Sequence, residues 1–317
     1  MTHARTRARR PLLRAVLITL AICTPNIIAA TKVFAAPVPA AVPGVEVQAP
    51  FRSDRLSVEV VGQGPDVILI PGFGCSREVW RAEAERLQAT HRVHLVQLAG
   101  FAGEPWVHGD GPFIQPAVEE LARYIRERGL ERPAVVGHSL GGFSALMLAQ
   151  REPSLIGKVM TVDSLPFFSA LYGPQATPES ARPFAEQAAA GILNTPDEAF
   201  RSGQGAAAAG LSRDPETQAK MVEWTMAGDR RAMAAAIREV MTTDLRPGLA
   251  TMTTPVWAPY ASDAEGGAPA AVADATWGRE YAPLPGVRLI RVDDSRHFIM
   301  SDQPEKFADL MDLFLAD

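Results

Sequence analysis

Short apolar runs and amphipathic stretches alternate along most of the chain after residue 50. Runs rich in Val, Ile and Leu are typical of buried strands, and stretches with apolar residues every three or four positions are typical of helices. Strands that alternate with helices favour an α/β fold with a mostly parallel sheet and helices on both faces. The pattern predicts strands at 56–61, 66–70, 92–98, 133–136, 158–162, 255–261 and 287–292, and helices at 77–89, 116–128, 140–150 and 304–315.

The alternation stops between residues 164 and 250. This segment has no convincing strand and contains several helical stretches rich in Ala and Met. Asp229 is a predicted N-cap for a helix over 230–241, because its side chain can accept from the first free N–H groups of that helix. We therefore predict one α/β core, formed by 51–163 and 251–317, with a helical cap at 164–250 inserted between two strands.

The first 35 residues have the composition of an export signal. They hold six basic side chains and no acid, and an apolar run over 12–30 precedes Ala35, where cleavage by signal peptidase is expected. Pro25 and Asn26 interrupt that run, which favours a cleaved signal over a retained membrane anchor. We predict a signal peptide at 1–35, a flexible leader at 36–50 and an exported chain, periplasmic or secreted, with the export route left open.

Charge and cysteine content narrow the classes of function. Removal of the six basic side chains takes the formal net charge from −5 to −11, so the mature chain offers no broad positive surface to nucleic acid. Cys75 is its single cysteine, which excludes an intrachain disulfide and a paired-cysteine metal motif. We expect Cys75 to be a small buried side chain rather than a reactive thiol.

The segment Gly137-His138-Ser139-Leu140-Gly141 carries the strongest chemical signal. It follows an apolar strand and opens a helix, which is the context that a Gly-x-Ser-x-Gly elbow requires. Such an elbow holds the serine at a sharp turn, and its glycines make room for the crowded backbone. The helix N-terminus also directs partial positive charge to the reacting centre. The motif predicts Ser139 as a nucleophile.

With this motif in this context, the chain resembles the α/β-hydrolase superfamily over nearly all of residues 51–317. The resemblance implies a catalytic triad in the order serine, acid, histidine. Of the six histidines only His297 follows Ser139, and it lies between the last predicted strand and the last helix, where the family places its base. We predict that His297 takes the Ser139 proton and later delivers it to the leaving group.

The acid of the triad has two candidates. A carboxylate must accept a hydrogen bond from the imidazole to fix its tautomer. The family position after the strand that follows the cap points to Asp263, and we favour that residue. Asp163 follows the strand before the cap, a position that some lipases of this fold use, and it remains the alternative.

The resemblance also implies an oxyanion hole of two backbone N–H groups. Leu140 would supply one, and Phe73, after the first glycine of the loop that follows strand 66–70, would supply the other. Relatives often carry a histidine where this chain has Pro71. A dinucleotide-binding interpretation of the same loop is disfavoured, because Arg77 occupies the third glycine position and the next strand ends without an acid.

Trp106 and Phe167 lie on loops that leave strand ends, and we predict that they line the substrate pocket. Large side chains of the cap either line that pocket as well or form the core of the cap itself, and the sequence leaves the two interpretations open. They are Met221, Trp224, Met226, Met233 and Met241.

The sequence contains no motif for a metal, a nucleotide or a nucleic acid, so we predict no cofactor and no metal. We predict a serine hydrolase whose partner is a small-molecule substrate, a small or medium apolar ester cleaved through an acyl-enzyme. Two alternatives stay open: a carbon–carbon bond hydrolase or lyase with the same residues, and a relative that binds a small ligand without turnover.

Overall fold

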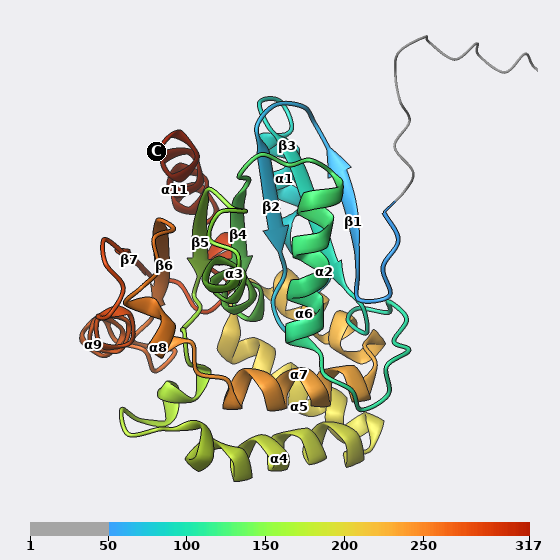
Figure 1. The fold of residues 1–317 in the computed structure, drawn as a ribbon. Coiled ribbons are helices and arrows are strands. Elements are labelled where there is room, and N and C mark those ends of the chain that lie inside the picture. Colours follow the sequence, from blue (N-terminus) through green and yellow to red (C-terminus); the bar gives the residue numbers. More distant parts are fainter. Residues whose placement is uncertain (1–50) are drawn as a thin grey trace, which may run out of the picture. The chain divides into compact units, whose positions relative to one another are not determined.

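The computed structural model describes residues 51–317, so the predicted signal peptide and leader lie outside the described residues. A seven-stranded sheet runs through it in the order β1-β3-β2-β4-β5-β6-β7 (Figure 1). Only β1 is antiparallel to its neighbour among the described strands, which confirms the predicted mostly parallel sheet. The strands are β1 (Leu56–Val61), β2 (Asp66–Ile70), β3 (Arg92–Leu98), β4 (Ala134–His138), β5 (Lys158–Val162), β6 (Val256–Ser262) and β7 (Arg288–Asp293).

Both faces of the sheet are buried, which explains why its strands are continuous apolar runs. In β2, Ile68 and Ile70 belong to one core cluster, and Val67 and Leu69 belong to the other. The first cluster is covered by α2 (Ile114–Glu127), α3 (Leu140–Arg151) and α9 (Ala270–Tyr281), and Figure 1 shows α2 and α3 in front of the sheet. The second is covered by α1 (Arg81–Leu87) and α11 (Pro304–Ala316).

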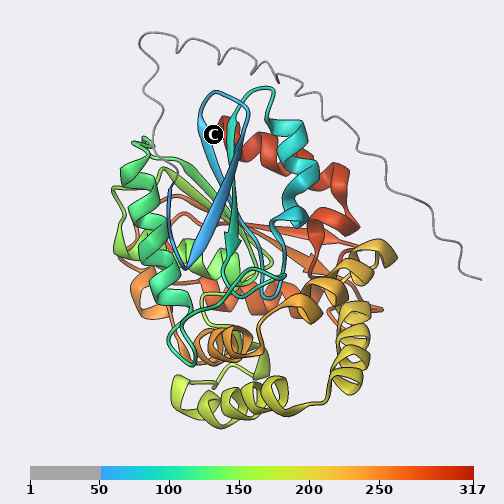
Figure 2. The ribbon, with the colours of Figure 1, turned by 90° about the vertical axis from the view of Figure 1, so that its right-hand side faces the viewer.

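Residues 164–250, between β5 and β6, form only helices and loops, as predicted. We call this segment the helical insertion. It lies beyond the carboxyl ends of the parallel strands, below the sheet in Figures 1 and 2. Its helices are η2 (Phe168–Tyr172), α4 (Pro178–Asn194), α5 (Asp197–Leu211), α6 (Pro215–Ala227), α7 (Arg230–Thr242) and α8 (Arg246–Leu249).

Aspartate side chains cap the starts of two helices of the insertion. Asp229 accepts from the N–H groups of Arg231 and Ala232, which confirms it as the N-cap of α7. Asp214 accepts in the same way from the N–H groups of Glu216 and Thr217 at the start of α6. Each cap satisfies two of the backbone donors that a helix start leaves free.

Helix α7 joins the insertion to the sheet. Met233 and Met241 are buried in the same core cluster as α2 and α3, so these two methionines belong to the core. A Cβ on Gly100 would lie 2.3 Å from the Cβ of Ala232, so only glycine lets α7 approach the end of β3 this closely.

Three helical regions differ from the prediction, the shortest being α10 (Ile299–Asp302), which precedes α11 and was not predicted. The helix expected at 77–89 begins as a 3-10 turn, η1 (Arg77–Trp80), and continues as α1. Helix α9 was not predicted, because its apolar pattern is weak: Ala273, Trp277 and Tyr281 face the core, and alanines lie on its other faces as well.

Candidate active site

Ser139 sits between β4 and α3 with φ 53° and ψ −121°, in the left-handed region that L-residues rarely adopt. The flanking glycines make this turn possible. A Cβ on Gly137 would lie 2.2 Å from the backbone of Gly141, and a Cβ on Gly141 would lie 2.3 Å from the carbonyl oxygen of Ile70. The predicted elbow is therefore present, and it presents Ser139 at the carboxyl ends of the strands.

His297 follows β7 and is paired with Asp163. The turn after β7 passes through Asp294, which has a φ of 60°, and His297 Nδ1 lies 2.7 Å from Asp163 Oδ2. The other carboxylate oxygen, Oδ1, accepts from the N–H of Ala261 at 2.9 Å. An ionised carboxylate only accepts, so Nδ1 carries the proton and Nε2 presents a lone pair. That is the tautomer a general base for a serine needs.

The prediction that Asp263 pairs with His297 is wrong. The Asp263 carboxylate accepts from Arg296 Nε at 2.8 Å and lies 3.3 Å from Arg213 Nη1. Burial opposes its ionisation, but the bond from Arg296 and the bonds from the N–H groups of residues 265 and 266 hold the pKa of Asp263 below its ordinary value. Asp263 is thus an ionised carboxylate that forms ion pairs with two arginines.

The backbone explains why Asp163 reaches the histidine. Asp163 directly follows β5, the strand beside β4, and its φ of 45° marks a sharp turn at the strand end. Asp263 instead exchanges two backbone hydrogen bonds with Ala268, so the chain after β6 turns back on itself. Asp adopts the left-handed conformation more readily than most residues, but the sequence does not reveal which of two aspartates will do so.

His138 braces the site, a role that the sequence analysis missed. Its Nε2 lies 3.0 Å from the carbonyl oxygen of His297, and its ring centroid is 4.5 Å from that of His297. Burial and the nearby His297 hold the pKa of His138 well below its ordinary value, so the ring is neutral and Nε2 donates. Its Nδ1 edge packs on Gly72, where a Cβ would come within 2.7 Å.

Phe73 and Leu140, the predicted oxyanion donors, line the same cavity as Ser139 and His297. Leu140 is the first residue of α3, so its N–H has no partner within the helix. These two residues lie on opposite sides of the nucleophile in the sequence, and the fold brings both to one cavity.

The cavity above Ser139 has a volume of about 600 Å³. Its walls are mainly apolar, and the sheet, the helical insertion and α9 all contribute to them. Met221 is among the lining residues, so one of the large side chains of the insertion does face the cavity. The large apolar side chains of the lining are Phe73, Leu140, Phe143, Leu165, Phe168, Leu171, Leu211, Met221, Ile237, Val240, Val272, Trp277 and Phe298.

The two predicted pocket aromatics do not line this cavity, and both predictions are wrong. Trp106 donates from Nε1 to the carbonyl oxygen of Gly109 and packs against Phe113. Phe167 is fully buried and lies under the guanidinium of Arg246, 4.6 Å from it. Phe168, one residue further, faces the cavity instead. Neighbouring side chains of an extended segment point to opposite sides, and the sequence of an irregular loop does not show which of the two faces the cavity.

Cys75 is buried, as predicted, and it lines the same cavity as Ser139. Burial raises the pKa of its thiol to about 12, so it is protonated at neutral pH. Within residues 51–317, no cluster of three or more His, Cys, Asp or Glu side chains could hold a metal ion. In the same residues, no helix combines the length and the apolar character needed to cross a membrane.

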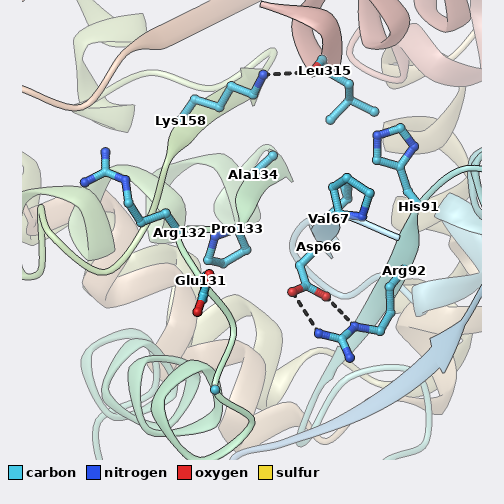
Figure 3. A pocket seen from close by; sticks show the side chains of 12 residues that line it. Asp66, Val67, His91, Arg92, Glu131, Arg132, Pro133, Ala134, Lys158 and Leu315 are labelled. Carbon is cyan, nitrogen blue, oxygen red and sulfur yellow. Dashed lines mark hydrogen bonds and ion pairs between the residues drawn. The ribbon is translucent and has the colours of Figure 1, made fainter. Parts of the chain in front are cut away.

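A second cavity, of about 520 Å³, lies at the opposite ends of β2, β4 and β5 (Figure 3). Two of its charged groups, Asp66 and Lys158, are already paired. Asp66 binds Arg92, with Arg92 Nη2 at 2.9 Å, and Lys158 Nζ donates to the carbonyl oxygens of Phe314 and Leu315 at 2.6 and 3.0 Å. This cavity brings together no nucleophile and base, so the chemistry belongs to the cavity above Ser139.

Known proteins resemble this chain in sequence and in fold. Residues 67–310 match the model of the "Alpha/beta hydrolase family". A "Pimeloyl-[acyl-carrier protein] methyl ester esterase" of Vibrio atlanticus is 35% identical over 122 residues, which are 38% of this chain and 45% of that relative. The protein of the same name from Vibrio vulnificus is 28% identical over 207 residues, 64% of this chain and 78% of that relative. The chain thus spans less than half the length of the first of these curated relatives.

Solved structures resemble the fold. The enol-lactonase from Burkholderia xenovorans LB400 has a TM-score of 0.68 at 18% identity, over 83% of this chain and 96% of that one. A thermophilic esterase from Thermogutta terrifontis has a TM-score of 0.68 at 20% identity, over 82% of this chain and 93% of that one. At these identities the likeness shows the fold alone.

Proposed function

Because the chain belongs to the alpha/beta hydrolase family, we propose that it is a serine hydrolase that cleaves carboxylic esters through an acyl-enzyme on Ser139. The observation that carries the proposal is the 2.7 Å contact between His297 Nδ1 and Asp163 Oδ2 beside the Ser139 elbow. The names of the matched relatives support an ester as substrate.

In the first half of the reaction, Ser139 Oγ attacks the ester carbonyl carbon while its proton passes to His297 Nε2. The imidazolium that forms is stabilised by Asp163, which keeps its own charge. The N–H groups of Phe73 and Leu140 would hold the oxyanion of the tetrahedral intermediate. As that intermediate collapses, the bond to the alcohol oxygen breaks, and His297 returns the proton to the departing alcohol.

In the second half, water attacks the acyl carbon and gives its proton to His297 Nε2. The bond between Ser139 Oγ and the acyl carbon then breaks, and His297 returns the proton to Oγ. The products are an alcohol and a carboxylic acid, and the enzyme regains its starting state. No step requires a metal or a redox cofactor.

The cavity favours a substrate with an apolar acyl group of small or medium size. Its volume of about 600 Å³ and its apolar lining suit an acyl chain better than a polar or charged group. The relatives named as methyl ester esterases suggest a small alcohol part. In this proposal the helical insertion serves as a cap over the cavity, to which Met221, Ile237 and Val240 contribute.

A fluorophosphonate probe tests the proposed nucleophile. The probe should form one covalent adduct per chain, on the peptide that contains Ser139, because an activated serine attacks its phosphorus atom. Peptide mass spectrometry of the labelled protein measures this, with a Ser139→Ala variant as the control. A folded wild-type protein that stays unlabelled would contradict the proposal.

We propose that the chain is exported and that cleavage follows Ala35, on the grounds of the basic and apolar segments before that residue. Mass spectrometry of the intact protein recovered from the cell envelope or the medium should give an N-terminus at residue 36. Recovery of the full-length chain in the cytoplasm alone would count against export.

A further inference from the structure

The chain on both sides of His297 is hydrogen-bonded to one short segment of the helical insertion, residues 209–213, which we call the strap. We propose that the strap positions the catalytic base, and that Arg296 and Asp302 are positioning residues acting through it. The inference rests on the proposed function, since it assigns the strap a part in the reaction of Ser139 and His297.

Both neighbours of His297 bind the strap directly. Arg296 Nη1 donates to the carbonyl oxygen of Ala209, and the N–H of Phe298 donates to the carbonyl oxygen of Leu211 at 3.1 Å. Ala209 and Leu211 belong to the last turn of α5, where carbonyl groups lack partners within the helix. The free carbonyl groups at the end of α5 therefore accept hydrogen bonds from the donors of the loop at 294–298, which we call the His297 loop.

The carboxylate of Asp302 accepts hydrogen bonds from both the strap and the His297 loop and so joins them. Its Oδ1 accepts from Ser212 Oγ at 2.7 Å and from the N–H of Arg213 at 2.8 Å. Its Oδ2 accepts from the N–H of Arg296 at 2.7 Å. Ser212 is fully buried, so the loss of Asp302 would leave its hydroxyl with neither a protein partner nor solvent to bond to.

The arginines of the two segments share a second carboxylate. Asp263, only 4% exposed, lies between Arg296 of the His297 loop and Arg213 of the strap. A buried carboxylate with two cations resists the removal of either, because the remaining charge loses its compensation. This is the function that the structure gives to the aspartate first expected to serve the triad.

His297 itself is held by the core, through Asp163 on its ring and His138 on its carbonyl oxygen. The strap bonds lie one residue to either side, so they control where the backbone of His297 runs. Helix α5 packs mainly on α6 and buries only Phe200 and Ala208, so these bonds are what attach its carboxyl end to the loop of His297. Any shift of the strap would move the base, and misplacement of a catalytic group by about 1 Å costs about 100-fold in rate.

The variant Asp302→Ala tests the inference. We expect kcat for p-nitrophenyl acetate to fall about 100-fold, with little change in KM, because the small ester makes few contacts with the insertion. The maximal rate of Ser139 modification by a fluorophosphonate should fall in parallel. Asp302→Asn, which keeps one acceptor oxygen, should give an intermediate loss.

The matched control is Asp214→Ala. It lies next to the strap and removes two cap bonds of α6, to the N–H groups of Glu216 and Thr217, but leaves the bonds to Asp302 in place. It should lower the melting temperature and leave kcat at the wild-type value. If Asp302 only stabilised the fold, kcat would fall together with the melting temperature in both Asp302→Ala and Asp214→Ala.

Two results would overturn the inference: a folded Asp302→Ala variant with wild-type kcat, or an equal loss of kcat in Asp214→Ala. If Asp302→Ala does not fold, Ser212→Ala removes one bond from the strap side alone, and an unchanged kcat there would equally overturn it. Failure of the proposed function looks different, because the wild-type protein would then not react with the fluorophosphonate at all.

Discussion

Replacement of Ser139 by alanine is expected to lower kcat for a p-nitrophenyl ester by about 10⁶-fold, since the acyl-enzyme can no longer form. His297→Ala should cost about as much, because a serine without its base is a weak nucleophile. The two side chains act as one unit, so the double variant should be hardly slower than either single variant. Steady-state kinetics of the three proteins measure this.

Circular dichroism and melting temperature provide the control for these variants. Ser139 lies in the left-handed region, where alanine is no easier to accommodate than serine, so the melting temperature of Ser139→Ala should stay near that of the wild type. A folded Ser139→Ala or His297→Ala protein that keeps more than a small fraction of the wild-type kcat would remove the residue from the mechanism. Losses that simply multiply in the double variant would show that the two groups act independently.

The second large effect is expected at Asp163. Asp163→Asn should lower kcat by about 10⁴-fold, because an amide that donates to His297 Nδ1 selects the tautomer with its proton on Nε2. Its Oδ1 would have to keep accepting from the N–H of Ala261, which leaves the amide nitrogen facing His297. The substitution thus preserves the shape of the site and removes its basicity.

Asp263→Asn is the matched comparison. It changes an aspartate at the end of the neighbouring strand β6, which binds Arg296 and Arg213 rather than the imidazole. We expect a loss of kcat at least about 100-fold smaller than that of Asp163→Asn, together with a lower melting temperature from two undercompensated arginines. If Asp263→Asn causes the larger loss of kcat, the assignment of the acid to Asp163 fails.

The sequence sufficed for the parts of this fold that depend on local pattern. Strands β1, β2, β3 and β5 begin and end at the predicted residues, and the other three lie within two residues of theirs, because short apolar runs bounded by turn residues mark strands locally. His297 could be found by elimination, since no other histidine follows Ser139. The elbow was readable because two glycines, at 137 and 141, are required by close backbone contacts.

The parts that failed depend on the path of loops. Asp163 and Asp263 both end parallel strands, and the choice between them was made by a left-handed backbone at one and a reversing turn at the other. Phe167 and Phe168 differ by one position in an irregular segment, and only one of them faces the cavity. His138 was visible within the elbow motif, but its bond to the His297 carbonyl joins residues 159 positions apart.

The site also has an order of assembly. Asp163 and His297 are 134 residues apart, and Ser212 and Asp302 are 90 apart, so the contacts that complete the site close long loops. A growing chain that has emerged only as far as β6 holds the nucleophile and the acid but not the base. In the proposed reaction Ser139 gains its base only when the chain beyond β7, the edge strand beside β6, is in place, so activity would report that this edge of the sheet has formed.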